Sequence, residues 1–154
     1  MERVWELEVA ASQEEVWAFH SSAEALEALT PPGRKLTPLT DDLEVRDGAL
    51  HVMGFKLFGI IPQKWKARIS DVRPPHGFVD TAEQSPFKAW RHHHEFIALP
   101  NGGTLIRDTV TYIPPGGPFA GLVNKLFVSK DLDALWAFRH QATKKALDSK
   151  LGKP

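Results

Sequence analysis

The sequence predicts one α+β domain, in which a curved antiparallel sheet of about six to seven strands wraps around a long C-terminal helix. Residues 3–9 and much of 35–113 alternate between apolar and polar side chains with the period of two that strands have. A helix-capping pattern follows the first strand and begins the first of two short helices. From about residue 119 to residue 151 the apolar positions recur with helical spacing.

Length and composition limit the classes of protein. The chain has 154 residues, a typical size for one domain, and we expect a single domain over residues 1–154. Its 19 basic and 19 acidic residues balance, which argues against nucleic acid as the main partner. The absence of Cys excludes disulfides, thiol nucleophiles and Cys-ligated metals. Because no apolar run is long enough to span a bilayer and the start does not resemble a signal peptide, we expect a cytoplasmic protein.

The first elements have clear boundaries. Strand alternation over residues 3–9 ends before Ser12 and Glu15, which have the spacing of a capping box and predict a helix start at Ser12. A second short helix fits residues 22–29. The segment Thr30-Pro31-Pro32-Gly33 ends it, because two prolines and a glycine cannot continue a helix.

The middle of the chain is predicted to be strands, and the end a helix. The Asn101-Gly102-Gly103 segment predicts a hairpin turn between the last two strands. The expected strands cover residues 35–39, 50–57, 63–70, 78–84, 89–99 and 104–113. The predicted helix covers 119–151, with an apolar stripe of Leu122, Leu126, Leu132, Leu135, Trp136, Phe138, Ala142, Ala146 and Leu147.

Several motifs in this order resemble the SRPBCC superfamily, which includes START-related lipid-transfer domains, polyketide cyclase/dehydrases and pollen-allergen-like helix-grip proteins. The resemblance covers nearly the whole chain and is greatest to a bacterial group of small ligand-binding domains. It implies a helix-grip fold with an apolar cavity between sheet and helix. The motifs are Leu29-Thr30-Pro31-Pro32, Pro62-Gln63-Lys64-Trp65, Phe78-Val79-Asp80, residues 85–96 (SPFKAWRHHHEF) and residues 108–114 (DTVTYIP).

Polar side chains lie among the aromatic rings of the last two strands. A period of two places His92 and His94 on one face of their strand, together with Trp90 and Phe96. Asp108 shares the inward face of the next strand, so a buried carboxylate beside an imidazole is expected. Three interpretations stay open: a structural network, polar contacts to a ligand, or a metal site. Because no other residue adds a distinctive ligand spacing, we expect neither metal nor cofactor.

The predicted function is binding of a hydrophobic or amphipathic small molecule, such as a lipid or polyketide-like compound, by a carrier or sensor. One alternative is a cyclase or dehydrase that uses the inward His and Asp side chains as acid and base. Another is an interaction module that holds a partner's apolar segment. The residues expected to line the site are Trp65, Trp90, His92, His94, Phe96, Asp108, Tyr112, Leu135, Trp136 and Phe138.

An apolar hairpin tip at residues 54–62 contains one charged residue, Lys56. It either folds over the mouth of the sheet and packs on residues 114–119, or forms a lip that admits ligand or touches a membrane surface. Contiguous apolar tips seldom stay exposed without a function. The sequence leaves the oligomeric state open.

Overall fold

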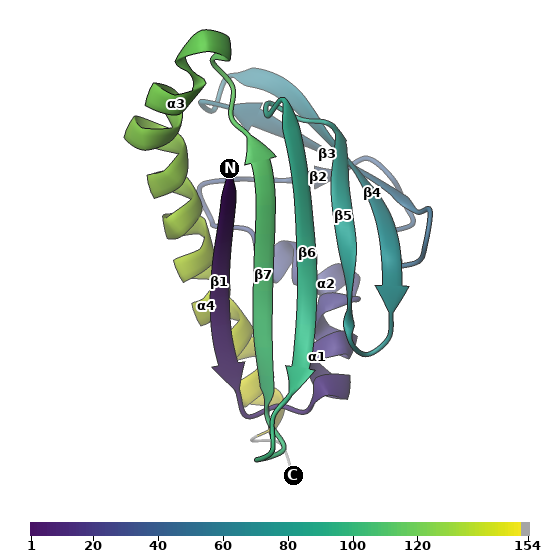
Figure 1. Cartoon of the computed structure of the whole chain (residues 1–154). Coiled ribbons are helices and arrows are strands. Elements are labelled where there is room, and N and C mark those ends of the chain that lie inside the picture. Colours follow the sequence, from purple (N-terminus) through teal and green to yellow (C-terminus); the bar gives the residue numbers. More distant parts are fainter. Residues whose placement is uncertain (152–154) are drawn as a thin grey trace.

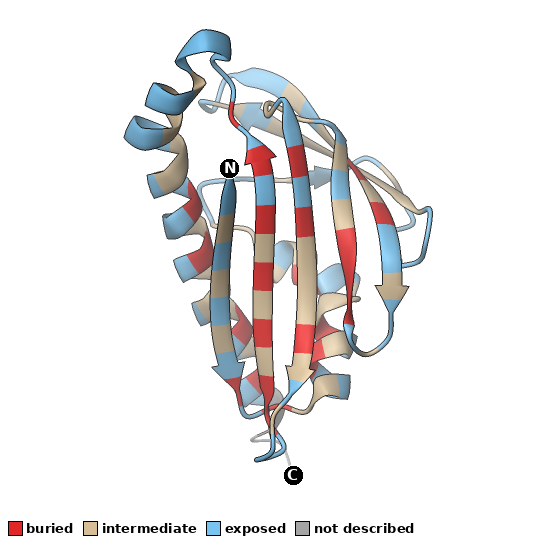
Figure 2. Ribbon diagram, in the orientation of Figure 1, coloured by how far each residue is buried: buried red, intermediate tan, exposed pale blue. Residues whose placement is uncertain are grey.

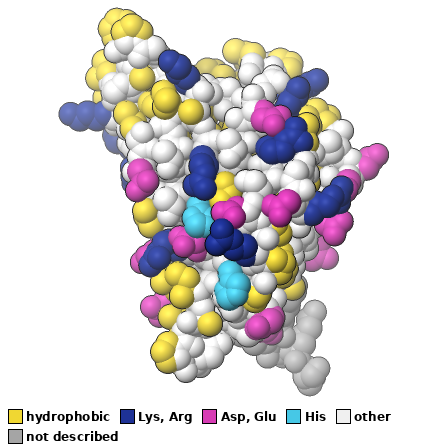
Figure 3. Space-filling model, turned by 45° about the vertical axis from the view of Figure 1, so that its right-hand side comes forward, with side chains coloured by type: hydrophobic (Ala, Val, Ile, Leu, Met, Phe, Trp, Pro, Cys, Tyr) yellow, Lys and Arg dark blue, Asp and Glu magenta, His cyan; other side chains and the backbone are white. Residues whose placement is uncertain are grey.

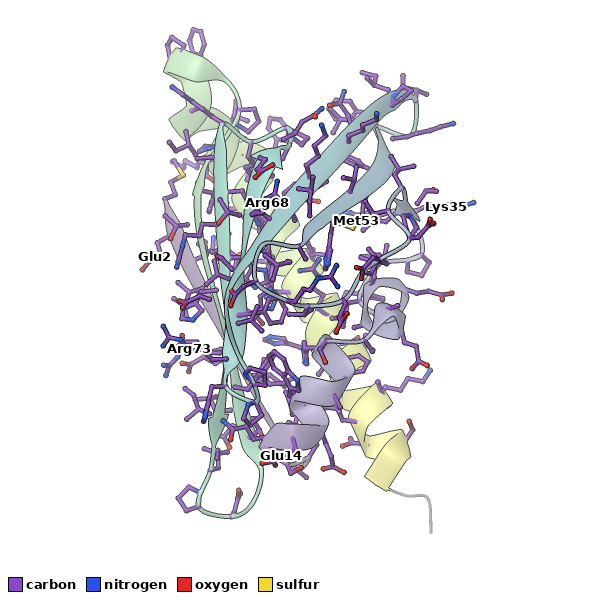
Figure 4. The ribbon with its side chains drawn as sticks, turned by 90° about the vertical axis from the view of Figure 1, so that its right-hand side faces the viewer. Glu2, Glu14, Lys35, Met53, Arg68 and Arg73 are labelled. Atoms are coloured by element: carbon purple, nitrogen blue, oxygen red, sulfur yellow. The ribbon has the colours of Figure 1, made fainter. Side chains whose placement is uncertain are left out.

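The computed structural model describes residues 1–151 and shows the helix-grip fold that the sequence predicts (Figure 1). Seven antiparallel strands form one curved sheet in the order β1-β7-β6-β5-β4-β3-β2. Figure 4 shows the sheet edge-on, with α1 and α4 on one of its faces. Residues 152–154 of the predicted domain lie outside the described residues. The elements before the C-terminal helical region are β1 (Glu2–Val9), α1 (Gln13–His20), α2 (Ala23–Ala28), β2 (Thr37–Pro38), β3 (Leu50–Leu57), β4 (Ile61–Arg73), β5 (Gly77–Gln84), β6 (Ala89–Ala98) and β7 (Thr104–Ile113).

Most element boundaries lie within two residues of their predicted positions. The capping box is confirmed: the Ser12 hydroxyl accepts from the Glu15 amide, and the Glu15 carboxylate accepts from the Ser12 amide at 2.8 Å. The strand expected at 35–39 is reduced to the two residues of β2. Pro38 has no N–H to donate to a ladder, so a proline confines this strand to a short piece at the sheet edge.

The C-terminal helical region is less regular than its apolar spacing predicts. A 3₁₀ turn (Gly117–Phe119), the short helix α3 (Ala120–Val123) and a π turn (Asn124–Val128) precede α4 (Ser129–Leu151). Because a π turn holds an extra residue, it changes the face that the preceding turns present. Leu122 and Leu126, predicted on the buried stripe, are in fact exposed. Within the part of the chain described, no helix has the length and apolar character needed to cross a membrane.

Buried side chains alternate along β6 and β7 and form two separate groups (Figure 2). The upper cluster consists of Trp90, Val110, Tyr112, Leu132 and Trp136, with half-buried rings such as Trp5, Trp65 and Phe87 against it. The lower cluster is larger and contains Val9, Ala11, Val16, Phe19, Ala25, Ile69, Phe78, Phe96, Ile106 and Leu147. The sheet therefore covers two apolar cores rather than one.

Glycine is required at position 77, where β5 begins, because the β6 backbone passes close to it. Replacement of Gly77 tests this close approach of β5 and β6. Its φ is +141°, and an added Cβ would lie 1.9 Å from the His94 carbonyl oxygen. We expect Gly77→Ala to destabilise the fold by about 3 kcal/mol or more, because backbone must move. Gly102→Ala is the matched control: its φ is +84°, but nothing lies within 4 Å, so about 1–2 kcal/mol is expected. Urea unfolding measures both; equal losses would contradict the close approach.

Candidate functional site

Four ionisable side chains on three neighbouring strands face the helices where the two clusters meet. They are Asp80 on β5, His92 and His94 on β6, and Asp108 on β7. His92 packs edge-on against Trp136 of the upper cluster, with ring centroids 5.3 Å apart. His94 stacks at 4.2 Å on a ring of the lower cluster, that of Phe78. The four groups therefore separate the two apolar cores.

The two imidazoles and two carboxylates pair in a crossed pattern. In the sheet register His92 is opposite Asp80, and His94 is opposite Asp108. The short contacts instead run diagonally: His92 Nε2 lies 2.7 Å from Asp108 Oδ1, and His94 Nε2 lies 2.8 Å from Asp80 Oδ2. The directly opposite pairs meet through Nδ1 at 3.4 and 3.5 Å. Every imidazole nitrogen thus has a carboxylate partner inside the network.

Burial and pairing oppose each other in setting the charges. Burial alone lowers the pKa of His92, but hydrogen bonds to Asp108 and Asp80 outweigh it and raise that pKa to about 9. Burial and the neighbouring His92 cation lower the pKa of His94 to about 4. Burial raises the carboxyl pKa values, but the imidazoles outweigh it and hold both Asp pKa values well below the ordinary range. At neutral pH the network holds two carboxylates, one imidazolium and one neutral imidazole.

Helical residues complete this polar layer. His20 of α1 donates from Nδ1 to the Val16 carbonyl oxygen at 2.9 Å, and burial lowers its pKa. Burial lowers the pKa of Arg139 on α4, while the carboxylates of Asp108 and Asp80 raise it. Burial also lowers the pKa of the neighbouring His140. We call the seven residues Asp80, His92, His94, Asp108, His20, Arg139 and His140 the polar belt.

Asp80 and the helical members of the belt were not among the predicted site residues. The signal for Asp80 is its place in β5: it shares its face with Phe78 and Ala82, two positions away on either side. Arg139 and His140 lie three and four residues after Trp136, on the side of α4 where that ring is buried. For His20 a helical period from Val16 would have given the same indication.

The predicted apolar lining residues fall into two groups. Trp65, Trp90, Tyr112, Leu135 and Trp136 all belong to or pack against the upper cluster. Two others lie elsewhere. Phe96 belongs to the lower cluster, because its place on β6 is on the other side of the polar belt. Phe138 is half-buried and is two residues from Trp136, about 200° around the helix, so the two rings cannot face the same way.

Two side chains pack on the ring of Trp136. Trp5 stacks on it at 4.2 Å with nearly parallel planes, and the Arg139 guanidinium lies 4.8 Å from its centroid. Its Nε1 atom is buried and has no hydrogen-bond partner among the described residues. Nε2 of His140, one helical turn further along α4, is also buried and unpartnered. These two nitrogens are polar groups of the concave side that the protein's own hydrogen bonds leave unused.

Two hollows of about 260 and 350 Å³ lie in the described part of the chain, and each is lined by both polar and apolar residues. The first lies where β4, β5 and β6 meet α1, and includes Arg73, His76 and Glu95. The second lies between the end of β1 and α4, beside Lys144 and Asp148. Neither includes a residue of the upper cluster.

One potential metal-binding group overlaps the belt. One ligand atom each from Asp80, His92 and His94 lies within 4.8 Å of the others. However, these atoms already hydrogen-bond to carboxylate or imidazole partners within the network, and the imidazole rings overlap at 3.6 Å. A cation would need to displace the His92 proton and move two imidazole rings whose centroids lie 3.6 Å apart. The geometry therefore favours charge pairing over metal ligation.

A family model identifies the family to which this chain belongs. The model for polyketide cyclase/dehydrase and lipid transport proteins matches residues 9–139, most of the chain. The chain belongs to this family. A comparison with curated proteins gives no match.

Solved structures share the family fold at low sequence identity. Protein Ms6760 from Mycobacterium smegmatis is 18% identical over 97% of this chain and 92% of that one, with a TM-score of 0.71. Norcoclaurine synthase from Thalictrum flavum, in a complex with a transition-state analogue, is 20% identical over 99% and 96%, with a TM-score of 0.70. A nucleoside-diphosphate sugar epimerase from Corynebacterium glutamicum is 27% identical over 95% of this chain, which spans only 29% of that protein, with a TM-score of 0.66.

Removal of one charge from the belt tests whether the crossed pairs stabilise the fold. Asp108→Asn leaves the His92 cation with a weaker partner in a buried position, so we expect a loss of about 3 kcal/mol or more. The control is Glu6→Gln, which breaks the exposed Arg107–Glu6 pair and should cost under about 1 kcal/mol. Urea unfolding compares them. Equal, small losses would show that the crossed pairs do not stabilise the fold.

The belt also predicts a maximum in stability near pH 6.5. The folded pKa of His92 exceeds its unfolded value, so its contribution is lost as pH rises from 6.5 through about 9. The folded pKa of His94 lies below its unfolded value, so the unfolded state binds a proton more readily and stability falls as pH drops from 6.5 toward 4. The stabilisation from the two carboxylates is lost at still lower pH. Urea unfolding at stepped pH should give this bell shape, and His92→Gln should flatten its alkaline side. A flat profile from pH 6.5 to 9 would contradict a charged His92.

Proposed function

We propose that this chain binds an amphipathic small molecule, such as a lipid or polyketide-like compound, between the sheet and α4, as a carrier or sensor. Membership of the polyketide cyclase/dehydrase and lipid transport family supports ligand binding in general. The observation that supports this site is the buried, unpartnered Nε1 of Trp136 within an aromatic cluster.

An unpaired donor at this position is costly. More than nine in ten buried polar groups in proteins have a hydrogen-bond partner, and one without a partner costs about 1–3 kcal/mol. Trp5 and Arg139 both pack on the Trp136 ring, so turning its N–H toward another acceptor would disturb both contacts. An oxygen atom on a ligand would supply the missing acceptor. The surrounding rings of Trp65, Trp90 and Tyr112 would cover its apolar part.

The charges of the polar belt favour an uncharged oxygen on that ligand. Two carboxylates, Asp80 and Asp108, face two cations, protonated His92 and Arg139. A ligand carboxylate would add a buried charge without a partner, which is costly in a site of low polarity. A hydroxyl, ester or ketone oxygen can accept from Trp136 without altering this balance. We therefore expect a neutral head group.

The ligand would enter through the upper cluster. Its outer rings, Trp65 and Phe87, are half-buried and pack edge-on at 6.1 Å, so solvent already reaches them. Neither hollow is lined by these rings, and in the proposed mode of binding the two rings separate to admit the ligand. The lower cluster lies on the other side of the belt and would stay closed.

The crossed pairing argues against the acid–base alternative. A catalytic imidazole needs a nitrogen free to reach the substrate. All four nitrogens of His92 and His94 instead lie within 3.5 Å of a carboxylate oxygen of the same network. The belt is therefore better suited to hold the strands and the charge balance than to transfer protons.

Native mass spectrometry followed by solvent extraction of the purified protein tests the proposal directly. We expect a mass shift and the release of an apolar compound with an uncharged oxygen. The absence of any added mass, together with no binding of long-chain alcohols, esters or ketones, would exclude the carrier function. Release of a peptide instead would favour the interaction-module alternative.

The role of Trp136 can be measured with dodecanol and dodecanoate as test ligands. We expect dodecanol to bind more tightly than dodecanoate, and Trp136→Phe to weaken dodecanol binding about threefold to tenfold through loss of one hydrogen bond. Trp17→Phe, in a ring that packs on the lower cluster, is the control and should leave affinity within about twofold. Calorimetry gives both constants. Equal effects of the two substitutions would contradict a site at Trp136.

A further inference from the structure

Two apolar tips project from the same end of the molecule. One is the turn between β3 and β4, and the other is the segment from Gly117 to Val128, before α4; Figures 1 and 4 both place them at the end that holds α3. Hydrophobic side chains also gather at this end in Figure 3. Their exposed fractions are 84% at Phe58, 75% at Ile60, 69% at Phe119 and 67% at Phe127, and Leu122 and Leu126 are exposed as well. One alternative from the sequence required the first tip to pack on residues 114–119. These exposed fractions show that it does not.

The backbone at Phe58 does not explain a phenylalanine there. The turn from Leu57 to Ile60 closes through a backbone hydrogen bond of 3.2 Å, and φ is +54° at Phe58 and +73° at Gly59. Positive φ at both central positions is the signature of a type I′ turn, where Asn-Gly is the preferred pair. A bulky residue with positive φ is strained. Because the ring is also almost fully exposed, neither turn geometry nor packing accounts for it.

The charge around the tips has one sign. Residues 54–66 and 113–130 contain Lys but no Asp or Glu, although the whole chain has 19 residues of each sign. Lys56 and Lys125 are exposed, and neither forms an ion pair with any described residue. The first acidic residues of α4 do not neutralise this end, because Asp131 pairs with Arg34 and Asp133 with Arg3. Anionic surfaces match this pattern.

We infer that the two tips dock on a lipid bilayer that has anionic headgroups. The rings of Phe58 and Phe127 enter the boundary between headgroups and acyl chains, while Lys56 and Lys125 lie at headgroup level. A protein interface usually has one central apolar patch with a polar rim. Two separate apolar tips, each with cations and no carboxylates, fit an extended anionic surface better. This docking is independent of whether the chain carries a ligand.

Co-sedimentation with vesicles tests the docking. We expect binding to phosphatidylcholine vesicles that contain phosphatidylglycerol and much weaker binding to phosphatidylcholine alone. Phe58→Asn should raise the lipid concentration for half-maximal binding about tenfold, because the ring that enters the bilayer is removed. Asn suits the positive φ, so the melting temperature should stay the same or rise, which excludes unfolding as the cause. Val4→Thr, which removes a half-exposed apolar side chain on β1, should leave binding unchanged.

The lysines give a second, independent test. Lys56→Gln and Lys125→Gln should each weaken binding to the anionic vesicles about fivefold, and added salt should reduce the difference. The control is Lys144→Gln, an exposed lysine on α4 outside the two tips, with an expected change below about twofold. Equal binding to neutral and anionic vesicles would overturn the proposed headgroup chemistry. Absence of vesicle binding together with self-association that Phe58→Asn abolishes would show that a second copy covers the tips.

Discussion

The crossed charge pairing between β5, β6 and β7 is the constraint on which the rest of the concave side depends. A buried carboxylate needs a partner, and here two carboxylates each accept a short hydrogen bond from the imidazole diagonal to them. This pairing fixes the relative register of three central strands. It also divides the apolar interior, because an apolar side chain inserted among these charged groups would leave a buried charge without its partner.

The two cores that result differ in ways that bear on function. The lower core joins α1, α2 and the closed end of the sheet through buried aliphatic and aromatic side chains. The upper core consists mostly of large rings, several of them half-buried, and contains the fully buried indole N–H of Trp136, which has no acceptor among the described residues. The exposed apolar tips lie at that same end (Figure 1). The proposed ligand site and the proposed docking tips thus lie on the same side of the belt.

Local sequence patterns were sufficient for the fold, and for part of the site. Alternation placed His92, His94 and Asp108 on inward faces, and the Ser12–Glu15 pair located the start of α1. The partnership with Asp80 depends on the register between β5 and β6, which alternation within one strand does not determine. The π turn before α4 could not be predicted either, because a helical period fitted over residues 119–151 does not reveal one extra residue in a turn. For this reason Leu122 and Leu126 were wrongly placed on the apolar stripe. Phe96 shares a strand face with Trp90 but packs in the other cluster, so a shared face does not by itself place two residues in one site.

The divided core has a consequence for how the molecule moves. Cooperative unfolding units tend to follow contiguous apolar clusters, and a layer of fixed charges gives a natural boundary between two such units. The rings around Trp90 and Trp136 can then open and close while the amides near Phe19 and Ile106 stay protected from hydrogen exchange. The belt is then the boundary between two unfolding units of one continuous sheet, and the end above it can open while the end below it stays folded.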